Sequence, residues 1–257
     1  MTDITSLQNS RIKHIVKLRE DKKTRNEDGL LLVEGFDEIQ LALAAGHTPQ
    51  TLLSAPELGS RSATFSARET LSVSRAVFEK ISHRENPDGW MGIFPIPQTS
   101  LNDLKLSKTP LIIVAESIEK PGNLGAILRT ADAAGVDALL VCNPRVDVWN
   151  PNVVRASRGA AFSVPIVACE NAEALKWLKG GAIRIAAASP SAEEIYSDVD
   201  LKSPVAIVVG TEDEGLSDFW MSNADVKVKI PMMGKVNSLN VSVSTALILY
   251  EAMRQRR

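Results

Sequence analysis

The stretch that decides the fold class is LIIVAESIEKPGNLGAILRTADAAGVDALLVC, residues 111–142. It contains two apolar runs, residues 111–115 and 138–142, with a turn at Pro121-Gly122 and a helical pattern over residues 124–134 between them. Continuous apolar runs are typical of strands buried on both faces of a parallel sheet. Parallel neighbours need a crossover connection, which is usually a helix. The stretch therefore predicts a strand, a helix and a second strand of an α/β domain.

The same alternation continues to the end of the chain, so we expect one α/β domain over residues 111–257. The pattern predicts strands at residues 163–167, 183–188, 205–210 and 226–230, and helices at residues 153–158, 172–179 and about 241–255. Such a series indicates a mostly parallel sheet covered by helices on both faces. Ligands of these sheets usually bind beyond the carboxyl ends of the strands, so the loops after strands are the candidate site.

Residues 1–95 predict a second, smaller α/β domain with apolar segments of its own. An amphipathic helix is expected from residue 10 to 21, ending before a turn-like cluster at residues 26–29. A buried strand at residues 30–35 and a helix closed by Gly46 follow. Residues 96–110 are bounded by prolines and poor in large apolar side chains, so we expect them to be the linker between the domains.

The composition excludes several classes of protein. The net charge of -2 argues against a protein that coats nucleic acid without specificity. No stretch approaches the ~18 to 20 apolar residues that cross a bilayer, and the start has no apolar signal core, so a cytoplasmic protein is expected. The two cysteines have no CxxC spacing and no nearby histidine, so neither a disulfide framework nor a metal site is predicted. All three histidines lie in the first third of the chain, so the later part has no histidine base.

One charge run stands out in the first domain. Residues 11–25 contain seven basic side chains and only two acidic ones, Glu20 and Asp21. Such a run is either the solvated face of a helix or a patch that binds phosphates, and the residues alone leave both interpretations open.

Three loops that follow strands carry polar side chains. In residues 116–132, Asn123 could cap a helix that binds an anion, or be no more than a cap, with Arg129 paired to Asp132. The two glycines there do not complete a GxGxxG pattern, which argues against a Rossmann-type enzyme. The acidic loop 210–217 could coordinate a metal, bind ribose hydroxyls or form a simple turn, although its spacing does not fit a calcium loop. In residues 230–244, Ser238 or Asn240 could be only an N-cap.

Taken together and in this order, the three loops resemble a known family. NxGxxxRTA from Asn123, GxExxGL from Gly210 and IPMxGxxxSLNVSVS from Ile230 resemble motifs one to three of the SpoU (TrmH) family of RNA ribose methyltransferases, within the SPOUT superfamily. The segment RASRGA from Arg155 resembles the family's segment between motifs one and two. The region around Asn9 and the LLVEG strand is similar, more loosely, to the small substrate-binding domain of many members.

The resemblance implies a fold, a cofactor and an assembly. It implies an α/β, SPOUT-type parallel sheet whose C-terminal segment forms a trefoil knot, preceded by the small α/β substrate-binding domain. It implies S-adenosyl-L-methionine as cofactor, bound in that knot. It also implies a homodimer through the methyltransferase domain, with apolar side chains of the terminal helix at the interface. The cofactor-binding residues implied are Gly210, Glu212, Ile230, Met232, Gly234, Ser238 and Leu239. The terminal-helix residues implied are Val241, Val243, Ala246, Leu247, Leu249 and Tyr250.

The implied reaction is methyl transfer to a ribose 2'-hydroxyl of RNA. Arg129 matches the residue generally assigned as catalytic, either as a base assisted by an RNA phosphate or as a cation that stabilises the developing alkoxide. Its neighbours in the implied catalytic set are Asn123, Glu212, Ser238 and Asn240. The implied RNA-binding residues are Arg11, Lys13, Lys22, Lys23, Arg25, Arg155 and Arg158. The separate first domain favours ribosomal RNA, 23S rRNA above all, over tRNA. The alternatives are a tRNA ribose methyltransferase and a noncatalytic RNA-binding or ribosome-assembly factor.

Overall fold

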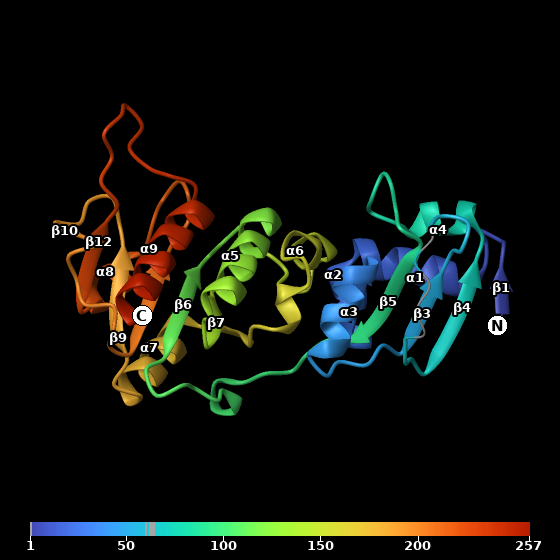
Figure 1. The fold of residues 1–257 in the computed structure, drawn as a ribbon, viewed down its shortest axis with the longest axis horizontal. Coiled ribbons are helices and arrows are strands. Elements are labelled where there is room, and N and C mark those ends of the chain that lie inside the picture. Colours follow the sequence, from blue (N-terminus) through green and yellow to red (C-terminus); the bar gives the residue numbers. More distant parts are fainter. Residues whose placement is uncertain (1, 60, 62–64) are drawn as a thin grey trace. The chain divides into compact units, whose positions relative to one another are not determined.

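The computed structural model describes residues 2–59, 61 and 65–257, and the chain divides into two compact units (Figure 1). Unit 1 comprises residues 1–98 and 149–163, and unit 2 comprises residues 99–148 and 164–257. Met1, Ser60 and residues 62–64 of the expected substrate-binding domain lie outside the described residues. Among the helices of the described part, none has the length and apolar character needed to span a membrane.

Unit 2 is built on a seven-stranded sheet in which all registered neighbours are parallel, in the order β10-β12-β9-β11-β6-β7-β8. Its strands are β6 (Leu111–Glu116), β7 (Ala138–Cys142), β8 (Ile166–Cys169), β9 (Arg184–Ala188), β10 (Glu194–Ile195), β11 (Val205–Val209) and β12 (Val226–Lys229). Its helices are the 3-10 turn η1 (Leu101–Asp103), α5 (Pro121–Ala134), α7 (Asn171–Gly180), α8 (Asp218–Asn223) and α9 (Val241–Arg256). The predicted parallel α/β sheet is confirmed.

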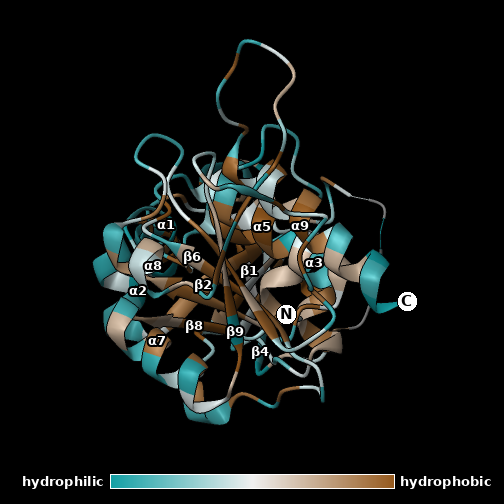
Figure 2. Cartoon of the chain, turned by 90° about the vertical axis from the view of Figure 1, so that its left-hand side faces the viewer, coloured by the Kyte–Doolittle hydropathy of each residue, from teal (hydrophilic) through white to brown (hydrophobic). Residues whose placement is uncertain are grey.

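The central strands β6, β7 and β11 are buried at every position. This burial explains their unbroken apolar sequences, because both faces of the sheet are covered. Figure 2 shows the strands mostly in the brown of hydrophobic residues, with more teal on helices and turns. Helices α5 and α9 pack against each other, and this contact brings the start of α9 beside the start of α5. The knotted path implied for the C-terminal segment stays a prediction.

Unit 1 holds a mixed five-stranded sheet in the order β1-β4-β3-β5-β2. Its strands are β1 (Thr2–Ile4), β2 (Leu30–Glu34), β3 (Thr51–Ser54), β4 (Glu69–Val73) and β5 (Trp90–Pro95). Its helices are α1 (Ser10–Glu20), α2 (Lys22–Asp28), α3 (Phe36–Ala44), α4 (Arg75–Ile81), α6 (Pro151–Ala156) and the 3-10 turn η2 (Ala160–Phe162). A core of α1 and α4 side chains packs on the sheet, and a second core includes side chains of α3.

Two details of unit 1 differ from the sequence-based expectation. The helix expected from residue 10 to 21 is present as α1, but a second short helix, α2, follows it and includes most of the residues expected to form a turn at 26–29. The carboxylate of Asp21 accepts from the backbone of Lys23 and Thr24 and starts α2, which ends at Gly29 in the left-handed conformation. Asp21 has the extended backbone of an N-cap residue, so α1 ends before it and α2 begins after it.

The second difference concerns residues 149–163, which follow motif one in sequence but belong to unit 1. Val154 and Phe162 of this segment are buried in a core with Leu31, Ile39 and Phe94. Burial of such side chains contributes about 1.5 to 3 kcal/mol each, which explains why the segment packs there. The expected linker also has structure, because Leu101 is buried in the core of unit 2.

Candidate active site

The carboxylate of Glu212 lies at the centre of a polar cluster in unit 2. Its Oε1 accepts a hydrogen bond from Nδ2 of Asn123 at 3.0 Å and a second one from Nδ2 of Asn240. Its Oε2 is paired with the ammonium group of Lys120. The hydrogen bonds from Lys120 and Asn123 hold the pKa of Glu212 below its ordinary value, because they stabilise the charged form.

Asn123 and Asn240 occupy different positions in their helices. Asn123 is not the cap expected from sequence, because α5 begins at Pro121 with Lys120 as its N-cap residue. Its side chain is therefore free of the helix backbone, and its Oδ1 accepts from Nδ2 of Asn240 at 3.1 Å. Asn240 does cap α9, with Oδ1 accepting from the backbone of Ser242 at 3.0 Å. The side-chain amide of Asn240 thus caps α9 and also bonds to Asn123 and Glu212.

Lys120 is a residue of this site that sequence reasoning missed. The ion pair with Glu212 raises the pKa of its ammonium group above the ordinary value. A cavity of about 100 Å³ opens beside the pair and is lined by Lys120, Asn123, Glu212 and Val241, among others. Its position just before the Pro-Gly turn of motif one was the only signal that could have indicated Lys120.

Glu116 is a second missed residue, and it holds the acidic loop in place. It is the last residue of β6 and only 4% exposed. Its carboxylate accepts from the backbone N–H of Ser217 at 2.8 Å, the Ser217 hydroxyl at 2.6 Å and Nδ2 of Asn171 at 2.6 Å. Asn171 in turn accepts from the Trp220 indole at 2.9 Å. Ser217 ends the loop that carries Glu212, so Glu116 fixes that loop to the sheet.

Close packing sets the shape of the same loop at its other end. A Cβ atom on Gly210 would lie 2.1 Å from the carbonyl oxygen of Gly215. Thr211 and Gly215 exchange backbone hydrogen bonds of 3.0 and 3.2 Å, which close the turn. Gly210 is therefore required by the turn itself, because no side chain fits between its two arms.

Arg129 and Ser238 are not part of the cluster. Arg129 lies on the exposed side of α5, and its side chain makes no hydrogen bond or ion pair with the described residues, so the pairing with Asp132 considered above is absent. Ser238 lies in the exposed loop between β12 and α9. The structure thus brings together Asn123, Glu212 and Asn240, and it leaves the other two expected catalytic side chains open to solvent.

The remaining residues of motif three form that long loop, which Figure 1 shows in red as it leaves β12 and returns to α9. Within the described part of the chain, no backbone amide of residues 231–239 donates a hydrogen bond to another backbone group. Met233 is 98% exposed and Val236 is 64% exposed. Exposed apolar side chains beside backbone groups with no backbone partner fit a ligand with polar edges and an apolar part, since covering the apolar side chains is favourable and the backbone groups can hydrogen-bond the polar edges. Gly234 has open space where a Cβ would stand.

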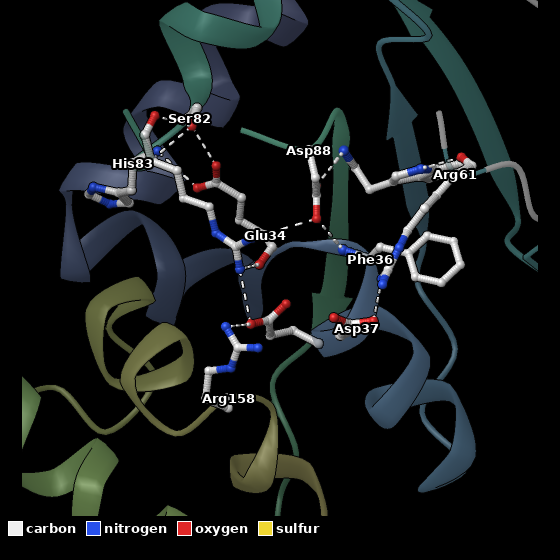
Figure 3. Close-up of polar contacts among 11 residues, drawn as sticks. Glu34, Phe36, Asp37, Arg61, Ser82, His83, Asp88 and Arg158 are labelled. Atoms are coloured by element: carbon white, nitrogen blue, oxygen red, sulfur yellow. Dashed lines mark hydrogen bonds and ion pairs between the residues drawn. The ribbon is translucent and has the colours of Figure 1, made fainter. Parts of the chain in front are cut away.

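The expected RNA-binding residues divide into three groups. Lys13, Lys22, Lys23 and Arg155 are exposed. Arg11 is exposed but paired with Glu69 at 2.5 Å, and Arg158 pairs with the buried Glu38 at 3.6 Å (Figure 3). Arg25 is only 1% exposed, and its guanidinium donates to the backbone oxygens of Leu18 and Arg19 at 2.7 and 3.1 Å. Its selection as an RNA contact was wrong, because it joins α1 to α2 from inside.

The acidic loop was also considered as a metal site. Over residues 2–59, 61 and 65–257, no group of three or more His, Cys, Asp or Glu side chains is placed to hold a metal ion. The acidic side chains of the loop at residues 210–217 point to separate partners, with Glu212 on Lys120 and Glu214 near Arg145 at 3.8 Å.

Comparison with known proteins identifies the family. The SpoU rRNA Methylase family model matches residues 110–250, and a model described as the MRM3-like substrate binding domain matches residues 9–92. The chain belongs to the SpoU rRNA methylase family. The resemblance inferred from the three motifs is therefore confirmed.

Similar proteins cover almost the whole chain. A 23S rRNA (uridine(2479)-2'-O)-methyltransferase of Streptomyces viridochromogenes is 31% identical over 98% of this chain and 92% of its own. A crystal structure of an RNA 2'-O ribose methyltransferase is 42% identical, covers 99% of both chains and has a TM-score of 0.88. An AdoMet-bound rRNA methyltransferase from Sinorhizobium meliloti is 30% identical, covers 98% of this chain and 97% of its own, and has a TM-score of 0.89.

Proposed function

We propose that this protein transfers the methyl group of S-adenosyl-L-methionine to a ribose 2'-hydroxyl of ribosomal RNA. The observation that carries the proposal is the meeting of Asn123, Glu212 and Asn240, one from each of the three motifs, around a single carboxylate. Membership of the SpoU rRNA methylase family supports the same reaction. The named relative that acts on 23S rRNA favours ribosomal RNA over tRNA as the substrate class.

The cofactor would be held by the loops of motifs two and three. The residues that we assign to it are Gly210, Glu212, Ile230, Met232, Gly234, Ser238 and Leu239. Unpaired backbone amides of residues 231–239 would bind its polar edges, and the exposed side chains of that loop would cover its apolar parts. When bound, S-adenosyl-L-methionine supplies a methyl group on a sulfonium sulfur, a strong electrophile. The protein then has to bind the ribose, orient its hydroxyl and help it to lose a proton.

Arg129 would act on that hydroxyl as a cation. An arginine side chain stays protonated at physiological pH, so a role as a literal base is chemically demanding. Arg129 is exposed and makes no ion pair among the described residues, so its charge is available to an RNA phosphate or to the developing alkoxide. Glu212 and its two amide partners would fix the loops that surround the reacting groups.

The RNA would be bound in part by the exposed cations of unit 1. Lys13, Lys22 and Lys23 come from the helices α1 and α2, and Arg155 comes from α6. A ribose must be accessible at the site, which favours a single-stranded loop or bulge over regular duplex RNA. In a bacterial cell, a ribosomal RNA substrate would place the activity in the cytoplasm, where bacterial ribosomes are assembled.

The protein would work as a homodimer through unit 2. On α9, Val243, Leu247 and Tyr250 are 47%, 38% and 53% exposed. Their spacing of four and three residues places them on one face of the helix, which is apolar without cover in a single chain. The other expected interface residues Val241 and Leu249 are buried within the chain, so they support this face from inside.

The test is methyl transfer from labelled S-adenosyl-L-methionine to RNA of a strain that lacks the gene, separated into large-subunit rRNA, small-subunit rRNA and tRNA. We expect label in a nuclease-resistant, ribose-methylated dinucleotide of large-subunit rRNA. Arg129→Ala should abolish the label without unfolding the protein, whereas Arg68→Ala, a change at an exposed arginine of unit 1, should not. Label in tRNA would overturn the substrate class. Cofactor binding without label in any fraction would favour a noncatalytic RNA-binding protein.

A further inference from the structure

Unit 1 contains a small notch in which side chains from three separate segments meet. Arg19 comes from α1, His83 from the turn after α4, and Arg155 from α6. We propose that this basic notch binds one phosphate of the RNA backbone, an inference that rests on the proposed RNA substrate. It adds Arg19 and His83 to the RNA-binding residues expected from sequence.

The size of the basic notch distinguishes a phosphate from a nucleobase. Its volume is about 10 Å³, and its floor includes the apolar side chains of Leu32 and Ile81. This is room for roughly one water-sized group. A base does not fit, whereas one phosphate oxygen does, with the rest of the phosphate at the mouth beside the cations.

Arg19 is held in a fixed position at the notch. Its Nη1 donates to the backbone oxygens of Lys80 and Ser82 at 2.8 and 2.9 Å, and its side chain is only 15% exposed. Its Nε is buried and has no hydrogen-bond acceptor within the described part of the chain. A buried donor without an acceptor is costly, and an anionic oxygen in the notch would supply one.

The carboxylate at the notch does not block it. Glu34 accepts from the Ser82 hydroxyl through Oε1 and from the backbone N–H of His83 through Oε2 at 2.9 Å. Figure 3 shows the imidazole of His83 directed away from this carboxylate. Glu34 therefore positions the turn that carries His83 and leaves the ring available to a ligand.

The electrostatics at His83 also fit an anion. Burial and then the charge of Arg19 lower the pKa of His83 below its ordinary value of 6.5, and Arg155 lowers it further, while Glu34 and Glu20 oppose the shift. A phosphate bound between the two arginines would offset their charge and raise this pKa. Binding would then be tighter at low pH, because the bound form holds a proton that the free form gives up.

Arg155 connects the basic notch to the segment between motifs one and two. The residue belongs to the segment between motifs one and two, yet this segment packs within unit 1. Arg155 is exposed, and the hydrogen bond that it donates to Oδ1 of Asn152 is long at 3.3 Å. The RASRGA segment would thus contribute a cation to the substrate-binding surface.

The first test measures binding of a mixed-sequence single-stranded RNA 12-mer to the full chain at several salt concentrations. Arg155→Gln should weaken binding about five- to tenfold and reduce the salt slope by about one, as expected for loss of one phosphate contact. Arg68→Gln removes the same charge from an exposed site in unit 1 and should leave both quantities nearly unchanged. Thermal unfolding like that of wild type shows that both variants are folded, since binding of S-adenosyl-L-methionine reports on unit 2 alone.

The second test follows the His83 ring by NMR while pH is varied, with and without the 12-mer. We expect its pKa to rise when RNA is bound, whereas the pKa of His47, also lowered by burial in unit 1, should not move. An unchanged His83 pKa with RNA bound, or equal effects of the Arg155 and Arg68 substitutions, would overturn the phosphate notch and leave the proposed function intact. A wild-type protein that binds S-adenosyl-L-methionine but no RNA would overturn both.

Discussion

The side-chain amide of Asn240 donates to the side-chain oxygen of Asn123 at 3.1 Å, although the two residues are 117 positions apart. Both residues also donate to Oε1 of Glu212. This triangle connects the first turn of α5, the loop after β11 and the start of α9. A change in any of its members therefore acts on all three motif segments.

Asn240 has two roles that substitution can separate. Serine is as good an N-cap as asparagine, so Asn240→Ser should retain α9 while it loses the amide donated to Asn123 and Glu212. We expect almost unchanged thermal unfolding and about a tenfold or greater loss of methyl transfer. Asn240→Ala should lose the activity and also about 1 kcal/mol of stability. Full activity of the serine variant would show that only the cap matters.

The lowered pKa of Glu212 predicts an acid-dependent loss of stability. A carboxylate with a depressed pKa in the folded state stabilises the fold at pH values above its unfolded pKa, and this contribution disappears as pH falls through the folded pKa. Glu212→Gln should therefore be less stable than wild type at pH 7, and the difference in stability should begin to narrow below about pH 4.5 and close once pH is below the lowered pKa of the folded state. Urea unfolding between pH 7 and 3 measures this gap. Glu193→Gln, at an exposed position, should show no such convergence.

The sequence predicted the sheet of unit 2 because its central strands are buried on both faces and keep unbroken apolar runs. The resemblance of the three loops to motifs one to three implied the meeting of Asn123, Glu212 and Asn240. It also implied that Arg129 and Ser238 lie with them, but neither side chain is part of the cluster. The sequence did not predict the burial of Arg25, since nothing in it distinguishes an arginine that donates to backbone oxygens inside the fold from one that is exposed to solvent.

Two other features depended on tertiary contacts that have no local pattern. The packing of residues 149–163 into unit 1 depends on Val154 and Phe162. Two of the residues in their core, Leu31 and Ile39, lie more than a hundred residues earlier in the chain. Glu116 is one acidic residue at the end of a strand, and its importance follows only from the approach of Ser217 and Asn171.

Replacement of Lys13, Lys22 and Lys23 by glutamine should weaken RNA binding and flatten its salt dependence. Each lost phosphate contact on single-stranded RNA reduces the slope of log K against log salt by about 0.7, so loss of one to three contacts reduces it by about 0.7 to 2. Cofactor binding should be unchanged, because all three side chains belong to unit 1. A control variant with Lys105, Lys108 and Lys202 replaced by glutamine loses the same charge from exposed positions in unit 2. Equal effects of the two triple variants would contradict a specific role of α1 and α2.

The apolar face of α9 predicts that Leu247→Glu yields a monomer. A charge in a buried dimer interface costs several kcal/mol of association free energy, which is enough to dissociate a dimer of moderate affinity. Light scattering after size-exclusion chromatography measures the mass of each species. Leu7→Glu, at another exposed apolar residue, 45% exposed in unit 1, should leave the dimer intact. A monomeric wild type would contradict the dimer itself.

Glu116→Gln should damage the active site from a distance, since Glu116 acts as a positioning residue for the loop of Glu212. Its Oε1 accepts two hydrogen bonds and its Oε2 a third, so an amide in its place sets a donor against a donor. We expect about 1 to 3 kcal/mol less stability and a lower kcat with little change in KM for RNA. Ser217→Ala removes one partner, and because both changes break the same network, the double variant should lose less than the sum. Additive losses would mean that Glu116 stabilises β6 without acting on the loop.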